Sequence, residues 1–210
     1  MKLSRRVKVA ISGVAMLGAL TACNANEAGA AVTYEGGRIT DEVVAAQSAQ
    51  LASELQIALS PKITQFTIQR LVTNLLIEQG AAMRGVTVNE GETQKFLTEA
   101  ADTVGGMDAL VSSAVQQGIP ASELPAQVRA RVAADQLGES LAPGEDTDTK
   151  DVAVGRYLVE VAQTINVDVN PRFGSWQAER LTVAPPPDDL SVPAPVDEAI
   201  LPGQLTIPTQ

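Results

Sequence analysis

The sequence predicts a mainly α-helical domain of about six helices in an orthogonal bundle. A small two- or three-stranded β element is expected to join its N- and C-terminal ends. Six segments repeat apolar residues at helical spacing between glycine and proline breaks. Short apolar stretches at residues 31–34 and 167–169 alternate as strands do. Hydrophobic residues make up 45% of the chain and aromatic residues only 3%, so Ala, Val, Leu and Ile are expected to form the core.

The domain is expected to open with a strand, a turn and a helix. Residues 31–34 form the strand, Glu35-Gly36-Gly37 the turn and Arg38-Ile39 a short return. Thr40 is a favourable N-cap, and the acidic pair Asp41-Glu42 follows it, where the helix dipole favours negative charge.

The six helices are expected at about residues 41–59, 63–84, 90–103, 107–117, 122–141 and 150–165. The inward side chains are expected to be Val44, Leu51, Leu55 and Leu59 in the first; Ile68, Leu71, Val72, Leu75 and Leu76 in the second; Leu124, Val128, Val132, Leu137 and Leu141 in the fifth; and Val154, Leu158, Val161, Ala162 and Ile165 in the sixth. Arg70 falls outside the stripe of the second helix. Asn89 and Glu92 have the spacing of a capping box.

The chain closes with a second strand candidate. Val167 and Val169 are expected to pair with Val32 and Tyr34, which ties the two ends of the domain together. Phe173 and Trp176 are then expected to pack over this sheet. Beyond residue 176, "APPPDDLSVPAP" and the prolines around it predict a disordered tail over residues 177–210.

The N-terminus has the order of an export signal. Four basic residues lie among the first eight, and the uncharged, mostly apolar run Val9–Leu20 follows. This run is shorter than the roughly 20 residues that a membrane span needs. Residues 1–22 are therefore interpreted as a signal peptide. The pair Arg5-Arg6 leaves a twin-arginine signal as an alternative, although the residues after it fit that pattern poorly.

Leu20-Thr21-Ala22-Cys23 follows the apolar run and resembles the lipobox of bacterial lipoproteins. The resemblance implies that Cys23 carries a diacylglyceryl group and becomes the N-terminus after cleavage, with residues 23–30 as a tether. Cys23 is the sole cysteine, so it cannot form an internal disulfide, and lipidation removes a reactive thiol. The alternative is a chance cysteine at an ordinary signal-peptide site. The expected location is the extracytoplasmic face of the cell membrane.

Composition narrows the possible functions. Removing residues 1–22 takes away four of the 15 Lys and Arg residues and none of the 25 Asp and Glu residues, leaving a net charge of −14. Such acidity argues against nucleic-acid binding, which needs a basic surface. Histidine, the commonest general base and metal ligand, is absent.

No motif for catalysis or for a cofactor is found. Asp146-Thr147-Asp148 begins like a calcium loop, but Asp151 stands where that loop needs glycine and Tyr157 where it needs glutamate. No dinucleotide, phosphate-binding or GxSxG motif is present. We therefore expect neither an enzyme nor a bound metal or cofactor. A hydrolase built on an unmarked serine and lysine remains an alternative.

Four segments in order carry a second resemblance. They are "AVTYEGGRIT", "AAMRGVTVNEGE", "GIPASELPAQVRARVAADQL" and "INVDVNPRFGSW". Their sequence over residues 31–176 resembles the SurA N-terminal domain, the chaperone module of extracytoplasmic folding factors such as SurA and PrsA. Those proteins also carry parvulin prolyl-isomerase domains of about 90 residues, for which this chain has no room. The resemblance implies a chaperone-like domain without isomerase activity, which binds unfolded or newly exported polypeptides.

Most apolar residues are expected in the core, and Phe66 and Met83 are the candidates for lining a client-binding cleft because they are large, adaptable or near a helix end. The alternative function is a non-catalytic adaptor lipoprotein that binds one envelope partner, and the Pro-rich tail favours it. A chaperone fold whose binding surface is filled in is a further alternative.

Overall fold

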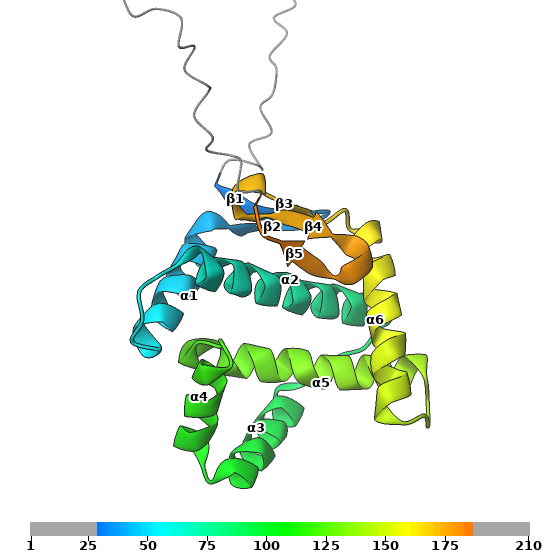
Figure 1. Cartoon of the computed structure of the whole chain (residues 1–210). Helices are drawn as coiled ribbons and strands as arrows, with labels where there is room; N and C mark the ends of the chain where they lie inside the picture. The colour runs from blue at the N-terminus through cyan, green and yellow to red at the C-terminus, as the bar shows by residue number, and fades with distance from the viewer. Residues whose placement is uncertain (1–28, 187–210) are drawn as a thin grey trace, which may run out of the picture.

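The computed structural model describes residues 29–186, and this part of the chain is mainly helical, as the sequence predicts (Figure 1). The α-helices are α1 (Asp41–Glu54), α2 (Pro61–Met83), α3 (Glu90–Val104), α4 (Met107–Gln116), α5 (Leu124–Leu141) and α6 (Thr147–Thr164). The strands are β1 (Ala30–Tyr34), β2 (Gly37–Thr40), β3 (Asp168–Val169), β4 (Ser175–Gln177) and β5 (Thr182–Ala184), and the 3₁₀ turns are η1 (Ala121–Glu123), η2 (Pro171–Phe173) and η3 (Ala178–Arg180). The expected signal peptide and Cys23 lie outside the described residues, and the expected tether overlaps them only at its end, where β1 begins.

A three-stranded sheet of order β2-β1-β3 joins the two ends of the domain, as expected. Val32 of β1 lies opposite Val169 of β3, which confirms that predicted pair. The pairing of Tyr34 with Val167 is not formed, because α6 ends in a left-handed Asn166 (φ 50°) and β3 starts only at Asp168. Instead the Glu35 amide donates to the Ile165 carbonyl at 2.6 Å.

A second hairpin, β4–β5, was not predicted. Trp176 lies opposite Val183, and Val183 is buried against the main core. The hairpin is attached to α2 because Gln65 donates to the Val183 carbonyl at 2.9 Å and Gln69 exchanges hydrogen bonds with Leu181 and Val183. The predicted domain boundary at Trp176 is therefore too early, and the predicted disordered tail is wrong for residues 177–184.

Helix α2 is the centre of the domain. It lies between the strands and α5, and α6 crosses the ends of both helices (Figure 1). The predicted inward residues Ile68, Val72 and Leu76 are almost fully buried. The phenol of Tyr157 in α6 donates to the carbonyl of Gly80 in α2 at 3.1 Å, so α6 packs directly on the α2 backbone.

Local sequence explains where the helices begin. The Thr40 hydroxyl accepts from the Val43 amide at 3.3 Å, and Asn89 and Glu92 form the predicted capping box. Helix α6 begins at Thr147 rather than near Lys150, because Asp146 accepts from the Thr149 amide at 2.8 Å. The end of the expected acidic loop is therefore the first turn of α6.

Two expectations about individual side chains are wrong. Helix α1 stops at Glu54 because Gln56 adopts a left-handed conformation (φ 55°) and the Ile57 amide closes the cap on the Ala52 carbonyl at 3.0 Å. Leu59, expected in the core, is consequently exposed. Arg70, expected outside the apolar stripe, is 8% exposed and donates to the Gln47 side chain. Within residues 29–186, no helix combines the length and apolarity needed to cross a membrane.

Candidate functional site

The two predicted lining residues lie on α2 but not together. Phe66 and Met83 are each 48% exposed. They are 17 positions apart, which is about 25 Å along a helix at 1.5 Å per residue. The structure therefore does not bring them into one cleft, and each must be considered with its own surroundings.

An apolar depression lies where the chain enters α2, and we call it the α2-entry groove. Its volume is about 500 Å³. It is lined by Leu59, Ser60, Pro61, Lys62, Thr64, Gln65, Arg172, Phe173, Pro185 and Pro186. One wall thus comes from the start of α2, and the other comes from η2 and the residues after β5.

Backbone geometry keeps apolar side chains exposed at this end of α2. The left-handed cap at Gln56 turns the chain out of α1, and Pro61 begins α2 with no amide hydrogen to satisfy. Between these points lie Ile57 and Leu59, with 54% and 56% exposed surface. Sequence reasoning missed both, although the Ser60-Pro61 break beside them was a signal for a surface loop.

Phe66 lies one to two turns further along α2 and is held in place. Its ring packs against Gly118, and a Cβ atom added there would overlap the ring. Gly118 has φ +84°, a conformation suited to glycine, and it ends α4. The half-exposed ring therefore bridges α2 and the α4–η1 turn, and its outer face is presented with little side-chain freedom. Ile57, Leu59 and Phe66, together with the α2-entry groove, are called the α2-entry surface, and of these three side chains Leu59 lines the groove itself.

The opposite wall of the α2-entry groove is fixed by ionic contacts. Arg172 pairs with Asp41 at 2.8 Å, and its guanidinium lies 4.4 Å from the centre of the Phe173 ring. Lys62 lines the groove and has no ion-pair partner within residues 29–186. The groove therefore offers apolar area together with one unpaired cation.

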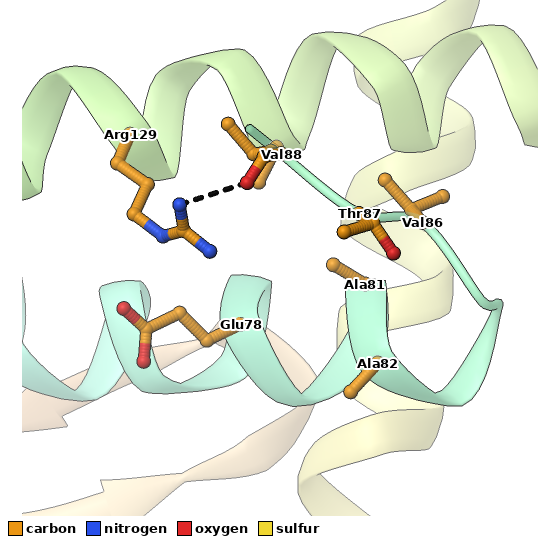
Figure 2. Close-up of a pocket in the computed structure, with 8 residues that line it drawn as sticks. Glu78, Ala81, Ala82, Val86, Thr87, Val88 and Arg129 are labelled. Carbon is orange, nitrogen blue, oxygen red and sulfur yellow. Dashed lines mark hydrogen bonds between the residues drawn. The ribbon is translucent and has the colours of Figure 1, made fainter. Parts of the chain in front are cut away.

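A second groove lies between α2, α5 and the segment that joins α2 to α3, and Figure 2 shows it. Its volume is about 290 Å³, and its lining is Glu78, Ala81, Ala82, Val86, Thr87, Val88, Arg129 and Ala133. Arg129 donates to the Val88 carbonyl at 2.9 Å. Glu78 faces Arg129 across the opening in Figure 2, and no ion pair joins them. We call this the Thr87 groove. Met83 is not among the residues that line it.

Arg70 is the one arginine that the described structure buries, and it lies between α1 and α2. Burial lowers its pKa from the ordinary arginine value, while Glu123 opposes that change. Its Nε and Nη1 atoms have no hydrogen-bond partner within the described residues. No described groove includes Arg70 in its lining, so we interpret it as a weak point of the α1–α2 contact rather than as a binding group.

The described residues contain no group of three or more Asp, Glu, His or Cys side chains placed to hold a metal ion. The chemistry available in the two grooves is apolar contact, hydrogen bonding and pairing with single charges. Comparison of the chain with protein-family models, with curated proteins and with solved structures gives no match in any of the three.

Proposed function

We propose that this chain is a lipid-anchored extracytoplasmic protein whose helical domain holds unfolded or newly exported polypeptides without catalysis. The observation that carries the proposal is the α2-entry surface, where an apolar groove is lined by the exposed Leu59 and two further large apolar side chains, Ile57 and Phe66, stay about half exposed near the same end of α2. The ordered SurA-like motifs, the export signal and the lipobox support the same reading. An exposed apolar groove is typical of interaction sites.

The energetics fit weak, reversible holding. Covering about 200 Å² of apolar client surface would contribute about 5 kcal/mol at 25 cal/mol per Å². Ordering a flexible client consumes part of this gain. Binding at one such surface is therefore expected with a Kd of about 0.2 mM or weaker. Lys62 would favour segments that carry an acidic residue beside the apolar ones.

The test uses the full lipid-anchored chain in nanodiscs and an aggregating, reduced secreted protein. Light scattering should fall progressively as the chain is added in increasing excess over the aggregating protein, and an equally acidic folded protein should have no effect. If the scattering is unchanged while circular dichroism shows the chain to be folded, general holding is excluded. Capture of one saturable envelope partner would then support the adaptor function, which the Pro185-Pro186 lining of the groove favours.

The surface itself is tested by Ile57→Ser, Leu59→Ser and Phe66→Ser. Ile57 and Leu59 are more than half exposed, so their substitutions should leave the melting temperature within a few degrees of the parent while suppression of scattering falls severalfold. Phe66→Ser also removes the contact of the ring with Gly118 and should therefore lower the melting temperature as well. Val152→Ser is the matched control, since Val152 is 54% exposed on α6, away from the groove. An equal loss with Val152→Ser would show that the effect is unspecific.

The anchor is tested separately at Cys23. Labelled palmitate should enter the wild-type chain and not Cys23→Ala, and the variant should leave the membrane fraction. Labelling of the variant would overturn the lipid assignment without affecting the proposal for the domain.

A further inference from the structure

We propose that the α2-entry groove is a docking site for the chain's own next segment, residues 187–192, whose sequence is Pro-Asp-Asp-Leu-Ser-Val. The inference goes beyond the proposed function, because it names an occupant of the groove that belongs to the chain itself. Its consequence for clients rests on the proposed function, since segment and client then compete for one groove.

The described chain ends at the α2-entry groove. Its last two residues, Pro185 and Pro186, are part of the groove lining. Their position is fixed by Gln65, which also lines the groove and donates to the Val183 carbonyl at 2.9 Å. The next residues therefore start beside the apolar wall, and six extended residues reach about 20 Å. Such a short tether gives a local concentration in the millimolar range, so a weak contact is enough for docking.

The charges of the groove and of the segment are complementary. Lys62 lines the groove and has no ion-pair partner within residues 29–186. Arg172 uses one nitrogen on Asp41 and keeps further guanidinium donors. No acidic side chain is among the described residues that line the groove. Asp188 and Asp189 are the first charged residues after the groove, and residues 187–210 contain no Lys or Arg. The acidic pair therefore supplies the charge that the groove lacks.

The apolar parts of the groove and of the segment match as well. Leu59 leaves 56% of its surface exposed on one wall, and the ring of Phe173 belongs to the other. Proline-rich chains bind aromatic-lined grooves at a low entropy cost, because the proline ring fixes φ in advance. Leu190 and Val192 follow the acidic pair and supply side chains that can cover Leu59.

The experiment measures how fast N-hydroxysuccinimidyl acetate modifies the Lys62 amine in the full lipid-anchored chain in nanodiscs, by peptide mass spectrometry. Combined Asp188→Asn and Asp189→Asn should raise this rate about threefold, because the amine loses its partners and its cover. Leu190→Ser should raise it about twofold, which separates docking from a purely electrostatic effect of the acidic pair.

Two controls define the specificity. Combined Asp197→Asn and Glu198→Gln removes the same two charges further along the chain, and should leave the Lys62 rate unchanged. Lys95 on α3 has a side chain that is 76% exposed, so its acetylation rate should be the same in every variant. All of these substitutions lie outside residues 29–186, so the helical domain itself keeps its own contacts.

A second readout is the effect on clients. The chain truncated after Pro186 should suppress light scattering about threefold more effectively at equal concentration, because an occupied groove binds a client only in proportion to its open fraction. Unchanged suppression, with Lys62 shielded in the parent, would overturn the competition between segment and client.

The remaining outcomes separate the inference from the proposed function. Equal Lys62 rates in the parent, the doubly amidated variant and Leu190→Ser overturn the docking and leave the proposed function intact. No suppression by either chain, with Lys62 shielded in the parent, overturns the proposed function and leaves the docking intact. Shielding of Lys62 that survives truncation and disappears on dilution would place a second copy of the chain in the groove, and overturns the inference.

Discussion

The central helices and the α3–α4 pair are equally helical but differently packed. Helix α2 buries ten of its 23 residues, whereas α3 buries two of 15 and α4 one of ten. Helix α3 begins at the capping box of Asn89 and ends at the left-handed Gly105, whereas α4 begins after Gly106 with no side-chain cap. Local signals therefore set the bounds of α3, while burial decides how strongly each helix is held. We call α3 and α4 the arm, and α2, α5 and α6 the central layer.

The difference has a consequence for motion. The arm contacts α5 and η1 through partly buried side chains such as Phe96, Leu97, Leu110 and Val111. Segments with few buried apolar contacts open locally at lower free energy than the whole domain. Amide exchange in the arm should therefore be faster than in α2, and the predictions below test how separate the two regions are.

The largest effect is expected in the central layer. Leu76→Ala removes a side chain that is 1% exposed at the centre of α2. The cavity and the lost apolar contact should lower the free energy of unfolding by about 3 kcal/mol. Urea unfolding followed by circular dichroism measures this loss, and the helices of the central layer should unfold together at a lower midpoint. Loss of helicity confined to one part of the chain would show that the central layer is not one cooperative unit.

The joint between the two regions is tested at Gly118. Gly118→Ala forces a side chain onto a residue with φ +84° and pushes its Cβ into the Phe66 ring. Together these effects should lower the free energy of unfolding by about 2 kcal/mol. Gly36→Ala is the matched control, because Gly36 has φ +102° and no heavy atom near the added Cβ. Phe66→Ala removes the ring that the new side chain would meet. In the Phe66→Ala background, Gly118→Ala should therefore lower the free energy of unfolding by no more than Gly36→Ala does in the parent. A loss as large as in the parent would mean that Phe66 does not restrain the arm.

Helical periodicity made the central layer predictable. The stripes of α2, α5 and α6 identified Ile68, Val72, Leu137 and Leu158 as core residues, and all four are buried. Leu59 was misplaced because its exposure depends on Gln56, a non-glycine residue in a left-handed cap, which the residue type does not signal. Local pattern thus predicts helix faces better than helix ends.

The parts that sequence could not predict depend on distant contacts. The hairpin β4–β5 has only three residues in each strand, and prolines follow it. Its attachment comes from Gln65 and Gln69, more than 100 positions earlier in the chain. The α2-entry groove likewise combines Leu59 with Phe173. Phe66 was expected to line a client-binding cleft, but it is not among the residues that line either groove, and its ring packs on Gly118.

The attachment of this hairpin is tested by Gln69→Ala. The substitution leaves the Val183 amide and the Leu181 carbonyl without their side-chain partner and should cost about 1.5 kcal/mol. Gln65→Ala removes a single hydrogen bond, to the Val183 carbonyl, and should lower the free energy of unfolding less than Gln69→Ala does. The single tryptophan, Trp176 in β4, reports the change by fluorescence. Equal costs for both variants would contradict the dominant role of Gln69.

A smaller and local effect is expected in the arm. Leu110→Ala removes a partly buried side chain of α4 and should cost about 1 kcal/mol. Amide exchange should accelerate in α3 and α4 and remain unchanged in α2. If Leu110→Ala and Leu76→Ala accelerate the same amides equally, the arm and the central layer unfold as one unit.

The smallest effect concerns the corner between α5 and α6, where the central layer is exposed. The hydrogen bonds from Thr149 hold the pKa of Asp146 below the 3.8 of a free aspartate. A lowered carboxylate pKa stabilises the fold above pH 3.8, and this contribution is lost as the pH falls through the folded pKa. Asp146→Asn keeps a capping oxygen and removes the titration, whereas Asp146→Ala removes both. The test measures unfolding midpoints between pH 2 and 6. The midpoints of wild type and Asp146→Ala should converge at acid pH, where Asp146 is protonated. Asp146→Asn should lack the part of the acid-dependent loss of stability that comes from Asp146. Parallel curves for wild type and Asp146→Asn would show that the cap charge contributes nothing to α6.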